Sequence, residues 1–123
     1  MSNYEYITQE ELEETKFSNK VLAICAVNAT MRVDGVVGFA SDITDNISKL
    51  LFGKEIFTKG VKIGKTKKGV EIGLYVVIGF GYNIPDVVWQ IQQKVRDEVE
   101  EITATKVAGV NVFVQHIRKK IYI

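Results

Sequence analysis

Several residue types on which enzymes and metal sites depend are scarce in this sequence. Its 123 residues include one cysteine, Cys25, and one histidine, His116. A single cysteine excludes a disulfide within the chain and is typical of a reducing compartment. The zinc sites built from cysteine and histidine need more ligands than one chain offers here. Cys25 lies in an apolar segment where a thiol is inert, and His116 is expected at the surface beside a basic tail. We therefore predict no catalytic residue, no metal and no cofactor, and a protein that is not an enzyme.

Long apolar runs and a strong net charge are also missing. No segment has enough consecutive apolar residues to cross a bilayer. The start, Met1 to Glu5, lacks the basic and apolar regions of a signal peptide. We expect a cytoplasmic protein, associated with a membrane only peripherally or through a partner. The net charge of +1 gives no overall field that favours nucleic acid or a lipid surface.

What is present is the composition of one folded domain. The chain is 46% hydrophobic and 25% charged, which is typical of globular proteins. The only proline, Pro85, lies well inside the chain, and no linker rich in serine or glycine divides it. We divide the sequence into an acidic segment, 1–16, weakly ordered or a short helix; a single domain, 17–117; and a basic tail, 118–123.

The hydrophobic pattern predicts helices and strands in an order that defines the fold class. A helix is expected over 19–31, with Ser18 as its N-cap. Because this helix is apolar nearly all round, it should be buried on more than one side or covered by a second chain. A strand over 36–40, a helix beginning at Asp42, and a hairpin turning at residues 67–69 follow. Pro85 then opens a helix whose apolar residues recur every three or four positions from Val88 to Ile102, and a strand spans 107–117.

This order predicts an α+β fold. An N-terminal helix precedes a βαββαβ-like unit, with a mostly antiparallel four-stranded sheet and helices packed on one face. The other face is expected to carry the side chains of Tyr75, Val77, Phe113 and Ile117. They are too apolar for an ordinary solvated surface, so we predict that this face is covered and is a protein interface. The cover could be another chain, or the helix over 19–31 within one monomer.

Basic residues gather at two places and suggest an alternative function. Both groups could contact an anionic partner: Lys62, Lys65, Lys67 and Lys68 in the hairpin, and Arg118, Lys119 and Lys120 in the tail. Tyr75 could stack on a base, which makes nucleic-acid binding the alternative to protein binding. Lysines on an exposed hairpin also protect a sheet edge from aggregation. With no arginine in the hairpin and a net charge near zero, we favour protein binding.

Two patterns look like chemical motifs and are better explained by structure. The segment from Gly60 to Thr66 has three residues between its glycines, whereas a phosphate-binding loop has four and leads into a helix. We interpret it as a strand entering a hairpin. The carboxylates at Asp97, Glu98, Glu100 and Glu101 are expected on the solvated side of a helix.

Three stretches resemble a known family. They are Asp42-Ile-Thr-Asp-Asn-Ile-Ser-Lys-Leu-Leu-Phe-Gly53, Gly81-Tyr-Asn-Ile-Pro-Asp86 and Val110-Asn-Val112. In order and spacing the chain resembles the alkaline shock protein family, or envelope stress response family, of Gram-positive bacteria. The resemblance spans roughly residues 19–117.

The resemblance implies a function but no site residues. Members of that family look like non-enzymatic cytoplasmic proteins that assemble with one another or attach to the membrane through a separate anchor protein. For this chain it implies a protein-interaction or scaffold role in the cell-envelope stress response or homeostasis. The expected action is self-association, or docking to a membrane-anchored partner.

Overall fold

The computed structural model describes residues 9–40, 56–58 and 60–119, with side chains described over 19–40 and 60–119. Its elements, in chain order, are α1 (Gln9–Met31), β1 (Val36–Phe39), β2 (Ile56–Thr58), β3 (Val61–Thr66), β4 (Gly69–Gly79), α3 (Ile84–Thr103) and β5 (Val107–Arg118). The helix predicted to begin at Asp42 lies outside the described residues.

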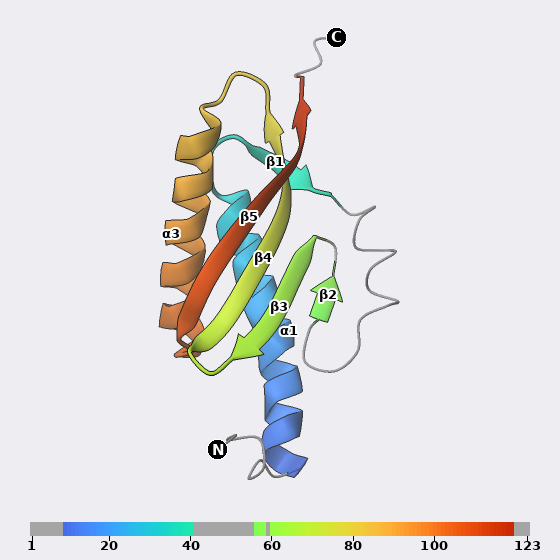
Figure 1. Cartoon of the computed structure of the whole chain (residues 1–123), viewed down its shortest axis with the longest axis vertical. Helices are drawn as coiled ribbons and strands as arrows, with labels where there is room; N and C mark the ends of the chain where they lie inside the picture. The colour runs from blue at the N-terminus through green and yellow to red at the C-terminus, as the bar shows by residue number, and fades with distance from the viewer. Residues whose placement is uncertain (1–8, 41–55, 59, 120–123) are drawn as a thin grey trace.

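The long strand β4 is the centre of the sheet (Figure 1). On one edge it pairs antiparallel with β3 along 69–74 and with β1 along 76–78. On its other edge β5 runs parallel to it. The short strand β2 extends the sheet beyond β3. Parallel neighbours need a long crossover connection, and α3 provides it between β4 and β5.

Tyr75 marks the point on β4 where one neighbouring strand gives way to another. Its backbone N–H donates to the carbonyl of Gly60, just before β3, over 2.8 Å. Its carbonyl accepts from the N–H of Ala40, just past β1, over 3.0 Å. Two strands far apart in the sequence therefore share one edge of β4, and Tyr75 is bonded to both segments.

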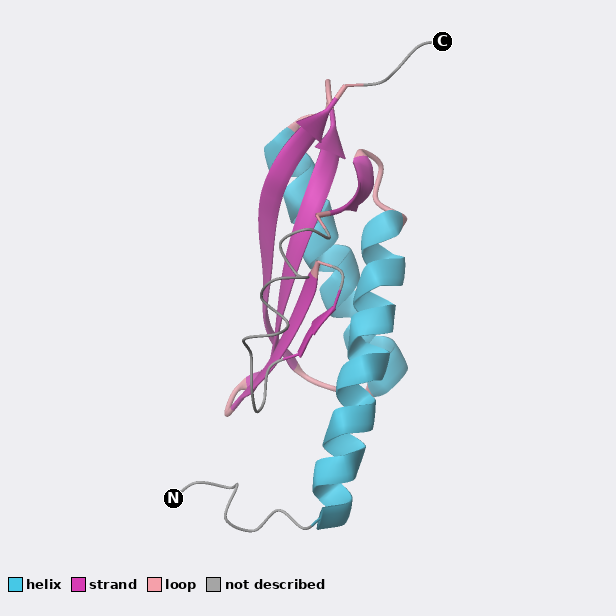
Figure 2. Ribbon diagram, turned by 90° about the vertical axis from the view of Figure 1, so that its right-hand side faces the viewer, coloured by secondary structure: helices cyan, strands magenta, loops and turns pink. Residues whose placement is uncertain are grey.

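Both helices pack on the same face of the sheet (Figure 2). Alternate β4 residues from Val70 to Ile78 point into the layer between sheet and helices and are at most 3% exposed. The α+β class, the mostly antiparallel sheet and the helices on one face are confirmed. The strand β2 was not predicted, because three residues are too few to show an alternating pattern.

The helix α1 is longer than predicted. It begins at Gln9, so Ser18 lies inside the helix and is not its N-cap. Residues 10–17 contain no glycine or proline, and glutamate and leucine are good helix formers, so nothing interrupts the helix before Ser18. Within its own chain α1 packs against α3, β3 and β1. It is thus buried on more than one side, although Ile24 remains 58% exposed.

The helix α3 has the N-terminus that its sequence predicts. The side chain of Asn83 caps it by accepting a hydrogen bond from the N–H of Asp86 over 3.1 Å, and Pro85 occupies the first turn. Its buried stripe is Val87, Ile91, Val95 and Val99. The predicted stripe was wrong at both ends, because Val88 is only partly buried and Ile102 is 64% exposed.

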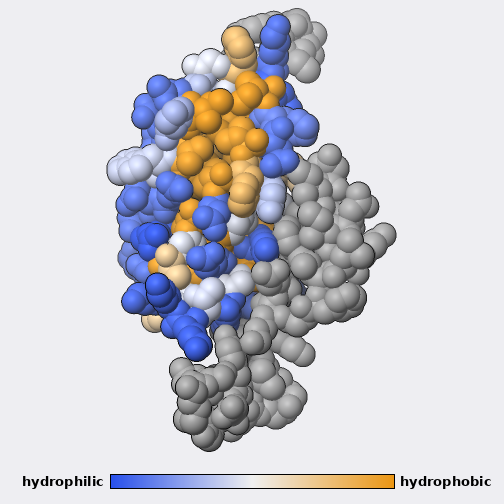
Figure 3. All heavy atoms as spheres, in the orientation of Figure 1, coloured by the Kyte–Doolittle hydropathy of each residue, from blue (hydrophilic) through white to orange (hydrophobic). Residues whose placement is uncertain are grey.

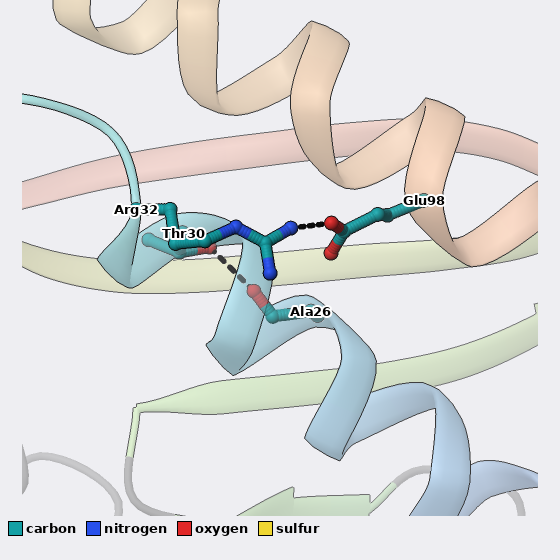
Figure 4. Close-up of polar contacts among 4 residues, drawn as sticks. All are labelled: Ala26, Thr30, Arg32 and Glu98. Carbon is teal, nitrogen blue, oxygen red and sulfur yellow. Dashed lines mark hydrogen bonds and ion pairs between the residues drawn. The ribbon is translucent and has the colours of Figure 1, made fainter. Parts of the chain in front are cut away.

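An ion pair joins the two helices (Figure 4). Arg32, one residue past α1, pairs with Glu98 of α3. In the last turn of α1, the hydroxyl of Thr30 donates to the carbonyl of Ala26 over 2.7 Å, which satisfies a fully buried polar group. The prediction that Glu98 simply faces solvent was therefore wrong.

Candidate functional site

The sheet face opposite α1 and α3 is called the open face here. The β4 residues Glu71, Tyr75 and Val77 point to this face, because the residues that alternate with them point toward the helices. Since α1 lies on the same side as α3, the alternative in which the helix over 19–31 covers this face is wrong (Figure 2).

Tyr75 and Phe113 form the aromatic centre of the open face. They are paired in the β4–β5 ladder, and their rings stack with centroids 4.7 Å apart and planes 18° from parallel. The ring of Phe113 also lies above Gly73, where an added Cβ would be 3.7 Å from its edge. Phe113 is nevertheless 43% exposed. Two of the four predicted interface residues are thus brought together, and one presents a large apolar surface.

The other two predicted interface residues are placed differently. Val77 is on the open face but only 3% exposed, so it lies beneath the surface of that face. Ile117 is paired with Ile78, whose side chain points toward the helices. A shift in the ladder between Val76 and Val77 adds one residue to β5, which puts His116 beside Val77 instead. Simple alternation placed Ile117 on the open face, and the bulge makes that placement wrong.

Further exposed apolar side chains, which the sequence interpretation did not single out, occur around the upper ends of β4 and β1. They are Val37 (42% exposed), Phe80 (66%) and Tyr82 (51%). The ring of Tyr82 lies against Gly79 and Gly35, at positions a Cβ would crowd. In Figure 3 apolar side chains gather on the open face over the upper parts of β4 and β5, with polar ones toward the β3–β4 turn. The sequence feature that could have indicated these exposed residues is the pair of aromatic residues on either side of Gly81, just after the end of β4.

A pocket of about 310 Å³ lies in the more polar half of the open face. Gly64 and Gly73 contribute no side chains to it, which leaves the space open. Its lining residues are Lys62, Gly64, Lys65, Thr66, Glu71, Gly73, Tyr75, Asn111 and Phe113. The pocket lining therefore combines a lysine of the open face, Lys62, with one carboxylate, one amide and the stacked aromatic pair.

The predicted basic residues do not form one surface. Lys62 and Lys65 line the pocket, and burial lowers the pKa of the Lys65 ammonium from its usual value. Lys67 and Lys68 are exposed in the two-residue turn, outside the pocket lining. Arg118 lies at the opposite end of β5, paired with Gly79, and Lys119 follows it. Lys120 lies outside the described residues.

The polar groups that might have suggested catalysis have other surroundings. Glu100 accepts a hydrogen bond from the N–H of Val107 over 2.9 Å, so it holds the start of β5 and does not face free solvent as predicted. Cys25 is buried in α1 and His116 is exposed on β5. Over the described ranges, no three histidine, cysteine, aspartate or glutamate residues are grouped so that they could hold a metal ion.

Within the same ranges, neither helix combines the length and hydrophobicity needed to span a membrane.

Comparison with known proteins identifies the family. Residues 7–119 match the sequence profile of the alkaline shock protein 23 family, which is described as having a cell envelope-related function. The chain belongs to this family. The resemblance deduced from the glycine, proline and valine stretches is thereby confirmed, and an envelope-related function follows from membership.

Relatives in the alkaline shock protein family cover nearly the whole domain. The chain is 33% identical to the uncharacterized protein YloU of Bacillus subtilis over 103 residues, 82% of this chain and 85% of that protein. It is 34% identical to the uncharacterized protein Spy1614 of Streptococcus pyogenes over 105 residues, 84% and 86% of the two chains. A second B. subtilis protein, YqhY, is 27% identical over 87% of this chain and 78% of its own. No solved structure matches the chain.

Proposed function

We propose that this member of the alkaline shock protein family is a non-enzymatic, cytoplasmic interaction module that serves the cell envelope by binding other protein chains through its open face. The partner is a second copy of the chain or a membrane-anchored protein. In the second case the protein attaches to the inner face of the membrane peripherally, without a span of its own.

One observation carries this proposal: the stacked aromatic pair on a sheet face that neither α1 nor α3 covers. Phe113 exposes 43% of its surface on this face, and Val37 and Tyr82 are exposed beside Gly79, farther along the same side of β4. Grouped exposed apolar residues on a folded domain mark interaction sites. Aromatic side chains with a rigid backing contribute most of the energy in many protein interfaces, and the strand beneath the Phe113 ring provides that backing.

A photo-cross-linking amino acid at position 113 tests the proposal inside cells. We expect it to capture defined protein partners, visible as discrete bands whose components mass spectrometry identifies. The matched control carries the same amino acid at position 102 on α3, where Ile102 is also exposed. Equal capture from both positions, or none from position 113, contradicts a binding role for the open face.

The pocket favours a second candidate function, binding of single-stranded nucleic acid. It places Lys62 beside the Tyr75–Phe113 pair, and a basic groove lined by stacking aromatics is a usual means of binding a nucleotide chain. Such binding to a mixed-sequence oligonucleotide should weaken steeply as salt rises. A protein that binds no oligonucleotide even at low salt excludes this candidate and leaves protein binding untouched.

A further inference from the structure

The outer edge of β5 is blocked along one half and open along the other. At its N-terminal half, side chains of α3 bond the outward backbone groups. Glu100 accepts from the N–H of Val107, Arg96 donates to the carbonyl of Val107 over 2.7 Å, and Gln92 donates to the carbonyl of Val110 over 3.1 Å. Beyond Val110, within the described part of the chain, no strand other than β4 pairs with β5.

The outward groups of the open half can be assigned from these bonds. Backbone N–H and C=O groups alternate in direction along a strand, and the carbonyl of Val110 points outward. Val112 and Val114 therefore direct their backbone groups to the outer edge, and Phe113 directs its own toward β4. The ladder with β4 is regular from Gly109 to Val114 and shifts only beyond it. A second strand therefore finds a regular edge centred on Phe113.

The sequence of this edge lacks the usual protection. Exposed edge strands normally carry charged residues or proline, which prevent pairing with another chain. From Val107 to Ile117 the strand has no lysine, arginine, aspartate, glutamate or proline. Its side chains include three valines within five residues, at Val110, Val112 and Val114, and β-branched residues favour strand pairing.

We propose that β5 pairs antiparallel with β5 of a second copy, about a two-fold axis that passes beside Phe113. In this register Val112 of each copy forms a hydrogen-bonded pair with Val114 of the other, so every outward group between them is used. A register centred on Val112 requires the carbonyl of Val110, which Gln92 already occupies. The bonding pattern thus favours the register centred on Phe113 over the one centred on Val112.

The side chains are self-complementary in that register. Phe113 faces Phe113 of the partner copy in a non-hydrogen-bonded pair, where side chains approach most closely. Each ring also stacks on its own Tyr75, so four rings meet across the axis. Asn111 of each copy lies opposite Gln115 of the other, and their amides can bond as donor and acceptor. No like charges oppose one another. This inference rests on the proposed binding role of the open face and names a second copy as its partner.

Disulfide trapping tests the register directly. In a Cys25→Ala background, Phe113→Cys should give covalent dimer on mild oxidation, because directly opposed residues of a non-hydrogen-bonded pair suit disulfide geometry. Asn111→Cys and Gln115→Cys should each give no covalent dimer alone and a disulfide-linked heterodimer when mixed. Glu101→Cys, exposed on α3, is the control for random collision.

The outcomes separate this inference from the proposed function. Trapping at position 113 and of the mixed 111 and 115 pair, above the 101 control, supports the two-fold strand pairing. A protein that is dimeric by light scattering but shows no such trapping overturns the pairing and leaves the interaction role intact. A strict monomer that still captures a different protein through position 113 also overturns it. A strict monomer that captures nothing contradicts both.

Discussion

Tyr75 and Phe113 stand side by side on two parallel strands, and their rings stack 4.7 Å apart on the face that neither helix covers. Tyr75 is also the residue whose backbone bonds to the segments before β3 and after β1. The aromatic pair therefore stands on a part of β4 that is bonded along one edge and paired with β5 along the other. A rigid apolar surface of this kind needs little ordering when a partner binds.

Truncating Phe113 should cost little stability. Phe113→Ala removes a ring that is 43% exposed, so we expect a loss near the ~0.5–1.5 kcal/mol of an aromatic pair. Ile72→Ala, at a fully buried position of β4, should cost about 2–5 kcal/mol because it leaves a cavity. Urea denaturation of both variants measures the contrast. Equal losses contradict the assignment of Phe113 to a surface and Ile72 to the core.

The cap of α3 should contribute measurably to stability. In Asn83→Ala the N–H of Asp86 loses its side-chain acceptor, so we expect a loss of about 1 kcal/mol. Asn83→Asp is the matched control, because its carboxylate can still accept that bond and is also favourable at a helix N-terminus. Thermal denaturation should rank the alanine variant lowest. An alanine variant as stable as the aspartate variant argues against the cap.

Two glycines in strands should respond oppositely to the same substitution. Gly69 has φ of +134°, and a Cβ there would lie 2.5 Å from the carbonyl oxygen of Lys106. We expect Gly69→Ala to cost roughly 1–3 kcal/mol from backbone conformation alone, with the backbone contact adding to this loss. Gly38→Ala meets no atom within 4 Å, and it should be neutral or stabilising by up to ~1 kcal/mol. Denaturation midpoints that move together contradict this geometry.

Lys65 should make stability depend on alkaline pH. Burial lowers the pKa of its ammonium in the folded chain below the usual 10.5, so the unfolded chain holds the proton more tightly. Between the two pKa values the unfolded state binds more protons, and folding therefore becomes more favourable as pH rises. We expect Lys65→Met to be more stable than the parent at neutral pH, with the difference shrinking toward pH 10.5. A constant difference contradicts the pKa shift.

The sequence predicted the elements whose patterns are local. The β3–β4 hairpin turns at Lys67 and Lys68 as predicted, because the alternation and the following glycine are strong signals. The capped start of α3 was similarly clear from Pro85. The start of α1 was not, since Ser18 is an acceptable cap and also an acceptable residue within a helix. Only tertiary packing determines which role it has.

The site was less predictable, because it depends on the register of pairing. Alternation along β4 identified Tyr75 correctly, and alternation along β5 identified Phe113. Beyond Val114 the bulge moves Ile117 toward the helices, and no residue in the sequence indicates that a bulge occurs there. The joint placement of Lys62 and Asn111 in one pocket likewise requires knowing that β5 lies beside β4 and β3 lies on its other edge.

Light scattering over a range of concentrations, with the wild type beside Phe113→Asp, tests the central claim most directly. The control is Ile102→Asp, which adds the same charge at an exposed apolar residue on α3. We predict that the wild type and the Ile102 variant gain mass together as concentration rises, whereas the Phe113 variant stays monomeric and folded. Indistinguishable masses for all three proteins, at every concentration, contradict self-association through the open face.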